Sequence, residues 1–202
     1  MSFRSIAGAG AVLAALALAT PANALNFSFT GNLSDANEEQ FFNFTVGAPS
    51  TVTFRTWSYA GGVNAAAMLI ARGGFDPILA VFDDTGALID QNDDGTCTEV
   101  AADSVTGACF DTYLDIMLGA GDYSVSVMAF SNFANGPNLS DGFTGTGSFT
   151  DVTGDARTTF WAFDILNVEQ ADQVGDVPEP ASLALLGLGA LGLGFMRRRR
   201  SA

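Results

Sequence analysis

The 202-residue sequence contains neither histidine nor lysine. Hydrolases that use a serine nucleophile activate it with one of these two bases, so Ser-His and Ser-Lys mechanisms are excluded. Hydrolysis by a pair of carboxylates stays formally open because acidic residues are abundant, but nothing in the sequence marks two of them as a buried pair. We therefore expect a protein that is not an enzyme, with a hydrolase of acidic mechanism as the weakest hypothesis.

Basic residues are scarce as well. Five of the eight arginines, Arg4 and Arg197, Arg198, Arg199 and Arg200, lie in the terminal segments, which leaves 3 arginines against 21 acidic residues and a net charge of −18 for residues 25–176. Such a charge repels nucleic acid and anionic lipid, and it favours cations, calcium above all. The alternative is that the charge only keeps a surface protein soluble.

The N-terminal segment has the pattern of a secretory signal peptide. Arg4 precedes an uncharged apolar run over residues 6–19, and Ala22-Asn23-Ala24 supplies the small-x-small ending that signal peptidase cuts after. We expect residues 1–24 to be removed and the mature chain to begin at Leu25. The remaining length suits one domain.

The chain has only two cysteines, Cys97 and Cys109. Without histidine, two thiolates cannot complete a tetrahedral nitrogen and sulfur site for zinc. In an exported protein the pair indicates a structural disulfide, which stabilises by roughly 2–3 kcal/mol.

Apolar residues recur mostly with period two between clusters of Gly, Asn, Asp and Pro, as in antiparallel strands with one solvent-exposed face. The pattern predicts an all-β, antiparallel β-sandwich or jelly roll over residues 25–170, followed by a linker over 171–176. About eight strands are expected, at 25–30, 42–46, 51–59, 78–82, 88–89, 113–118, 123–130 and 159–168.

Three smaller features accompany these strands. Residues 65–71 could form a helical turn, and residues 131–154 are expected to form a long surface loop with one strand at 147–152. Tyr59, Phe133 and Phe143 are the candidates for exposed aromatic contacts to a ligand.

The C-terminal segment combines three ordered parts. Val177, Pro178, Glu179 and Pro180 form an extended stretch that cannot be helical, residues 181–196 are uncharged and mostly apolar, and Arg197 to Arg200 follow. The apolar part would be about 24 Å long as a helix, at the short end for a transmembrane span, and the arginines would stay cytoplasmic. An ordinary membrane anchor is one interpretation.

The combination of these parts resembles the PEP-CTERM sorting signal, over residues 177–202. The resemblance implies a Gram-negative bacterium that makes exopolysaccharide, and processing by an exosortase at or near Pro178 to Pro180. The protein would then cross the inner membrane, be anchored transiently through its C-terminal helix, and end at the cell surface or outside the cell.

Residues 90–95 satisfy the first half of a calcium-binding EF-hand loop. The twelfth position holds Ala101 in place of the required glutamate, and strands flank the loop, so a true EF-hand is excluded. A calcium site in a β-sheet loop stays open, using Asp90, Asn92, Asp93, Asp94 and either Asp111 or Asp115. The alternative is a turn rich in Asp and Asn that holds no metal.

A second resemblance covers residues 25–135. Asp76-Pro77, Leu79, Val81-Phe82, Gly86, Asn92-Asp93-Asp94, Asp111, Gly121 and Tyr123 are similar to the pattern of bacterial pre-peptidase C-terminal-like domains. These are secreted jelly-roll sandwiches, some of which bind calcium or extracellular polymers. Here no peptidase precedes the domain, and the cysteine loop is inserted before Asp111.

Two functions follow as hypotheses. The first is an exported, non-enzymatic protein of the cell surface or extracellular matrix, with signal peptidase and an exosortase as partners and no nucleic-acid partner. The second is a calcium-dependent module that binds exopolysaccharide. The sequence establishes no cofactor, and calcium is the only candidate.

Overall fold

The computed structural model describes residues 24–175. The expected signal peptide before Ala24, the expected transmembrane helix at 181–196 and the whole 177–202 segment lie outside these residues. Within the described residues, no helix is long and apolar enough to span a membrane.

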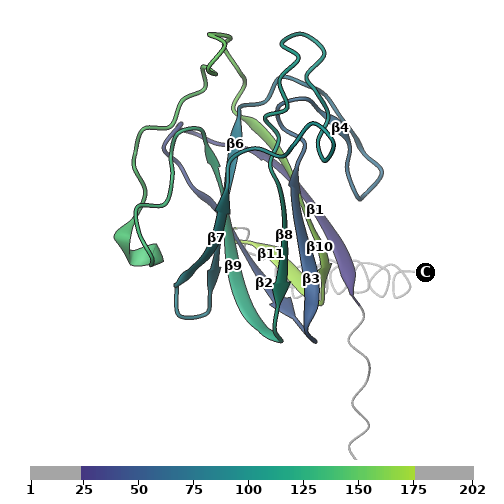
Figure 1. The fold of residues 1–202 in the computed structure, drawn as a ribbon, viewed down its shortest axis with the longest axis vertical. Coiled ribbons are helices and arrows are strands. Elements are labelled where there is room, and N and C mark those ends of the chain that lie inside the picture. The colour runs from purple at the N-terminus through teal and green to yellow at the C-terminus, as the bar shows by residue number, and fades with distance from the viewer. Residues whose placement is uncertain (1–23, 176–202) are drawn as a thin grey trace, which may run out of the picture.

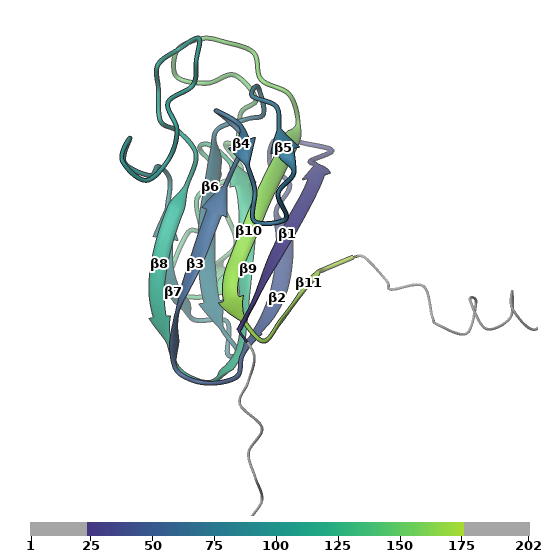
Figure 2. The same cartoon turned by 90° about the vertical axis from the view of Figure 1, so that its right-hand side faces the viewer.

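Two antiparallel sheets form the domain (Figures 1 and 2). One has the order β1 (Leu25–Asn32), β10 (Phe160–Val168), β3 (Ser50–Thr56) and β8 (Tyr113–Leu118). The other has the order β11 (Gln170–Gln173), β2 (Gln40–Val46), β9 (Gly121–Ala129), β6 (Pro77–Asp83) and β7 (Leu88–Asn92). Without β11, the eight long strands have the order of a jelly roll.

The core lies between the two sheets, where the period-two pattern buries alternate side chains. Phe42 of one sheet meets Trp161 and Phe163 of the other, with ring centroids 5.5 and 5.1 Å apart. Phe44 meets Phe54 at 5.3 Å in the same way. All five rings are at most 2% exposed, so these strand aromatics are core residues.

A second apolar cluster lies on the other face of the five-stranded sheet. Ile78, Ala80, Phe82 and Met128 are fully buried there. The loop over residues 130–143 covers them, contributing Phe130, Phe133, Ala134, Leu139 and Phe143. Because β6 packs on both faces, its residues Pro77 to Phe82 are all buried.

The structure confirms all eight expected strands, with small shifts at their ends, and adds three. β4 (Gly62–Val63) and β5 (Leu69–Ile70) form a short hairpin, so the helical turn expected at 65–71 is wrong. The linker expected from 171 is wrong at its start, because β11 pairs with β2 and buries Ala171. Residues 147–152 form no strand, only one bridge between Thr150 and Ala156.

The long connections gather at one end of the sandwich, the upper end in Figure 1. They include the segment between β7 and β8 and the segments before β6 and after β9. The turns at the opposite end, such as residues 119–120 between β8 and β9, are short. The upper end therefore carries most of the irregular structure, where binding sites usually lie.

Candidate functional site

Three aspartates meet at the upper end of the five-stranded sheet. Asp76 directly precedes β6, and Asp93 and Asp94 directly follow β7. These two strands pair antiparallel with Leu79 opposite Asn92, so continuing the register brings residues 93–95 alongside 76–78. One carboxylate oxygen from each aspartate lies within 4.8 Å of the others.

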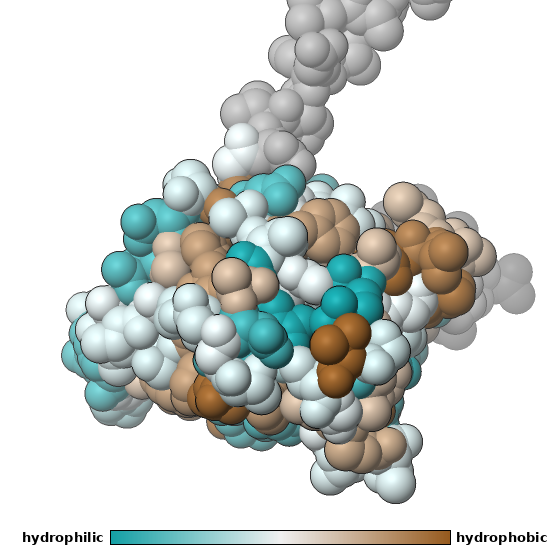
Figure 3. All heavy atoms as spheres, turned by 90° about the horizontal axis from the view of Figure 1, so that it is seen from above, coloured by the Kyte–Doolittle hydropathy of each residue, from teal (hydrophilic) through white to brown (hydrophobic). Residues whose placement is uncertain are grey.

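Burial increases across this cluster from Asp94 to Asp76. Asp94 is exposed, Asp93 is half-buried, and Asp76 is only 4% exposed. Oδ1 of Asp76 and Oδ1 of Asp93 are both buried without a hydrogen-bond partner among the described residues. In Figure 3, which views this end from above, hydrophilic side chains gather near the centre with separate hydrophobic ones around them.

Within residues 24–175, no basic side chain neutralises the cluster. Arg55 stacks on the Trp57 ring, with 3.8 Å between the guanidinium carbon and the ring centroid. Arg72 pairs with Asp103, and Arg157 pairs with Asp151 and Asp103. The described residues contain no further arginine and no lysine or histidine, so the three carboxylates face one another without a counter-charge.

The electrostatics follow from burial and crowding. Burial, and then the charges of Asp94 and Asp93, raise the pKa of Asp76 to about 9. Burial and Asp94 raise the pKa of Asp93 to about 7, and burial and Asp111 raise the pKa of Asp94 to about 6. The raised pKa values show that the three carboxyl groups resist carrying three negative charges at once.

Asp111 lies near these three but is used differently. It is 2% exposed, and its Oδ1 accepts from the Thr56 hydroxyl and the Tyr59 amide, both at 3.0 Å. Its Oδ2 accepts from the Ala60 amide at 2.8 Å. Burial raises the pKa of Asp111, and these hydrogen bonds oppose that rise. Asp111 therefore fixes the chain after β3.

The segment that follows Asp94 is held closely against the start of β8. The Gly95 amide donates to the Asp111 carbonyl at 2.9 Å, and a Cβ at Gly95 would lie 2.7 Å from a Val100 methyl carbon. The Thr112 hydroxyl lies 2.6 Å from the Asp93 carbonyl oxygen. The Cys97–Cys109 disulfide closes the loop, as the sequence predicted.

The structure thus brings together only part of the calcium set predicted from the sequence. Asp93 and Asp94 belong to the cluster. Asp90 contacts the Gln91 amide, and the Asn92 amide group donates to the Tyr113 carbonyl at 2.7 Å. Asp115 bonds Thr53 and Tyr113. Sequence reasoning missed Asp76, although the hairpin pairing of residues 77–83 with 88–92 would have placed it beside Asp93.

The residues that the sequence assigns to signal cleavage and to sorting lie near the ends of the chain. Ala24 is exposed, and Leu25 begins β1 and is 48% exposed. Ala22, Val177 to Pro180 and Arg197 to Arg200 lie outside the described residues.

The three aromatic residues expected to be exposed ligand contacts are not exposed, so this prediction is wrong. Tyr59 is fully buried, its hydroxyl donates to Asp151 at 2.7 Å, and Arg157 covers its ring. Phe133 and Phe143 are half-buried in the cluster outside β6.

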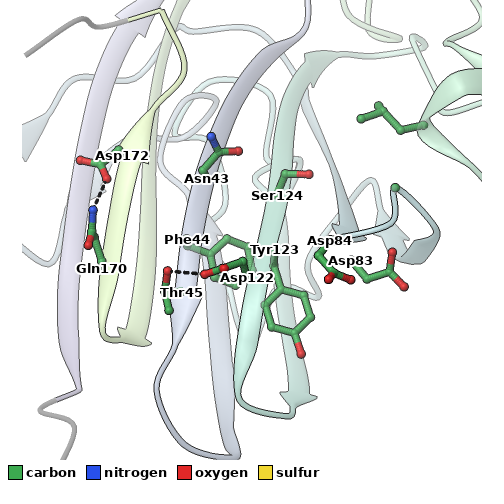
Figure 4. Close-up of a pocket in the computed structure, with 12 residues that line it drawn as sticks. Asn43, Phe44, Thr45, Asp83, Asp84, Asp122, Tyr123, Ser124, Gln170 and Asp172 are labelled. Atoms are coloured by element: carbon green, nitrogen blue, oxygen red, sulfur yellow. Dashed lines mark hydrogen bonds between the residues drawn. The ribbon is translucent and has the colours of Figure 1, made fainter.

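A polar groove of about 460 Å³ lies on the outer face of the five-stranded sheet (Figure 4). Asn43, Thr45, Asp122 and Ser124 from β2 and β9 lie between Gln170 and Asp172 of β11 on one side and Asp83 and Asp84 on the other. Thr45 donates to Asp122 at 2.7 Å, and Gln170 donates to Asp172 at 2.6 Å. The lining offers oxygens, amide groups and no basic side chain.

The architecture and the acidic surface define an all-β sandwich protein. Residues 176–200 match the PEP-CTERM protein-sorting motif. This motif implies processing by an exosortase, with export and surface localisation in Gram-negative bacteria. The comparison with curated proteins gave no match.

Proposed function

We propose that this protein is a non-enzymatic component of the cell surface or extracellular matrix, which its C-terminal signal delivers there. The observation that carries the proposal is the match of residues 176–200 to the sorting motif. Signal peptidase removes residues 1–24, the 181–196 helix holds the chain in the membrane transiently, and an exosortase then releases it at or near Pro178 to Pro180. The β-sandwich of residues 25–175 is the delivered part.

The mass of the mature protein recovered from its host tests this proposal. We expect a species that begins at Leu25 and ends near Pro180. A mature species that retains Arg197 to Arg200 would make the C-terminal segment a permanent anchor and would overturn the proposal.

The absence of histidine and lysine from the sequence supports a non-enzymatic role. The purified protein should release no reducing ends from the exopolysaccharide of its host. Sustained release that depends on Asp83, Asp84, Asp122 or Asp172 of the groove would favour a carboxylate hydrolase instead.

The second candidate function is calcium-dependent binding of exopolysaccharide, and the polar groove is the feature that favours it. Its carboxylate, amide and hydroxyl groups suit the many hydroxyl groups of a sugar chain. Co-sedimentation of the protein with host exopolysaccharide, in calcium and in chelator, is the test. Asn43→Ala with Asp172→Ala should weaken binding at least tenfold, whereas Asp90→Ala, outside the groove, should not. Equal binding by the parent, the double variant and Asp90→Ala would show that the groove does not bind the exopolysaccharide.

A further inference from the structure

We propose that Asp76, Asp93 and Asp94 bind one calcium ion, which fastens the start of β6 to the end of β7 and to the disulfide loop. This site differs from the one that the sequence predicts, because it uses Asp76 and leaves out Asp90 and Asn92. It depends neither on the sorting of the chain nor on polysaccharide binding.

The decisive observation is the Asp76 side chain. A buried polar atom normally has a hydrogen-bond partner, because leaving it without one is costly. Asp76 is 4% exposed, and its Oδ1 has no partner among the described residues. Asp76 nevertheless offers an oxygen within 4.8 Å of oxygens from Asp93 and Asp94. A cation between the three would satisfy the Asp76 carboxylate and the buried Oδ1 of Asp93.

The ligand types indicate which cation. Three carboxylates provide up to six oxygens and no nitrogen or sulfur, which favours a hard cation over zinc. Calcium takes six to eight oxygens in flexible geometry, and water completes its shell. Magnesium requires a near-ideal octahedron at shorter distances, which two loop ends of different strands satisfy less readily.

The site is also open to solvent on one side and supported by hydrogen bonds on the other. Asp94 is exposed, so an ion and its remaining waters reach the cluster from solvent. Behind the cluster, Asp111 and Thr112 hold the chain at Tyr59, Ala60 and Asp93 through hydrogen bonds. An ion bound to Asp94 is therefore connected through Gly95 to the Cys97–Cys109 loop, and it should order this end of the sandwich.

The test uses the mature protein purified from its host and stripped with chelator. Calorimetric titration should show one calcium site, with a Kd of about 10⁻⁴–10⁻³ M as in extracellular modules. Calcium a hundredfold above the Kd should raise Tm by about 5–10 °C. Magnesium at the same concentration should give a smaller shift.

Three variants separate a ligand role from a structural one. Asp76→Asn should lose calcium binding while its Tm in chelator stays equal to or above that of the parent, because it removes an unpaired buried carboxylate. The double variant Asp93→Asn with Asp94→Asn should also lose binding. Asp90→Asn, in the same hairpin, is the matched control and should bind normally.

Four outcomes would overturn the proposal. The first is that calcium at 10-fold the upper Kd given above produces neither heat of binding nor a Tm shift in the parent protein. The second and third are normal calcium binding by Asp76→Asn and loss of calcium binding in Asp90→Asn. The fourth is a Tm shift with magnesium equal to that with calcium.

Discussion

Asp103 shows how differently the acidic side chains of this protein are used. Unlike Asp76, it has basic and amide partners: the Arg72 guanidinium donates to it at 2.6 and 3.0 Å, and the Val105 and Thr106 amides donate at 3.0 and 2.8 Å. Although burial opposes the effect, these donors hold the pKa of Asp103 well below its usual range. Asp103 therefore stabilises the folded state as a charged group.

The sign of this pKa shift gives a prediction for acid. A carboxylate with a lowered pKa contributes stability above the pKa of the unfolded chain, about 3.9, and loses it as the pH falls further. Asp103→Asn should lower the free energy of unfolding by about 3 kcal/mol at pH 7, because Asp103 is a buried partner of Arg72 and Arg157. The difference from the parent should shrink between pH 4 and pH 2.

Denaturant unfolding of both proteins in chelator, at several pH values, checks this prediction. Taking the difference between the two proteins removes the contribution of Asp76, whose raised pKa has the opposite sign. A difference that stays constant from pH 7 to pH 2 would contradict it.

Residue type alone does not distinguish a candidate metal ligand from a structural carboxylate. Asp90 and Asp94 both fit a half EF-hand pattern, yet Asp90 contacts its own strand and Asp94 joins the cluster. Asp111 was a candidate ligand, but its oxygens accept from Thr56, Tyr59 and Ala60. These partners come from a distant part of the chain, so no local pattern could assign them.

The loop over residues 130–143 has a structural role that its composition does not predict. Its glycines and asparagines predict an exposed loop, but its aromatic residues cover β6. The Phe143 ring lies 6.1 Å from the Phe41 ring and 6.4 Å from the Phe82 ring. The loop therefore acts as a small third layer on the sandwich.

We expect Phe143→Ala to destabilise the domain by about 2 kcal/mol, less than a fully buried phenylalanine would, because Phe143 is only half-buried. The loop should also become more sensitive to protease, since one of its apolar contacts with the sheet is lost. Chemical unfolding and limited proteolysis with mapped cleavage sites measure both effects.

Val152→Ala is the matched control for this variant. Val152 lies beyond the covering loop and is 64% exposed, so the change should stay within about 0.5 kcal/mol. Equal stability and equal cleavage of Phe143→Ala and the parent would show that the loop does not stabilise the sheet.

The element boundaries show where sequence patterns are informative. Most of the long strands follow from alternation, because they bury one face against the opposite sheet. β6 is buried on both faces and is instead a continuous apolar run. β4 and β5 have two residues each and β11 has four, too few for a period to be read. β11 exists because its backbone pairs with β2 and Ala171 packs into the core, which are both long-range contacts.

For the whole molecule, the charge is divided between an acidic domain and a basic C-terminus. Residues 25–176 carry a net charge of −18, and Arg197 to Arg200 follow the apolar segment. This asymmetry matches the rule that positive residues stay on the cytoplasmic side of a membrane. We therefore expect the arginines to set the orientation of the sorting motif at 176–200 in the membrane.

Replacing all four terminal arginines with glutamine should therefore impair sorting. We expect at least a tenfold smaller fraction of processed protein at the surface, because the segment loses the charge that sets its orientation. Quantitative immunoblotting of surface and membrane fractions measures this. Arg55→Gln, a single change within the delivered domain, is the control and should be processed normally.

A processed fraction that is unchanged in the variant with four glutamines would show that the arginines do not direct sorting. The motif would then have to be recognised through Val177 to Pro180 and the apolar residues 181–196.

Features that depend on composition, period or contiguous motifs could be predicted from the amino-acid sequence. These are the all-β sandwich, the acidic surface and the absence of histidine and lysine. The disulfide follows from the only two cysteines, and the sorting motif consists of adjacent residues. None of these requires knowledge of which distant residues meet.

Which carboxylates come together depends on the tertiary fold. Asp76 meets Asp93 and Asp94 because β6 and β7 pair in one register. Asp111 lies near them, but its oxygens accept hydrogen bonds from the Tyr59 and Ala60 amides. The same contacts buried Tyr59 and covered β6 with the long loop. Each of these outcomes depends on hydrogen bonds and packing between segments that are separate in the chain, and a pattern along the sequence does not contain them.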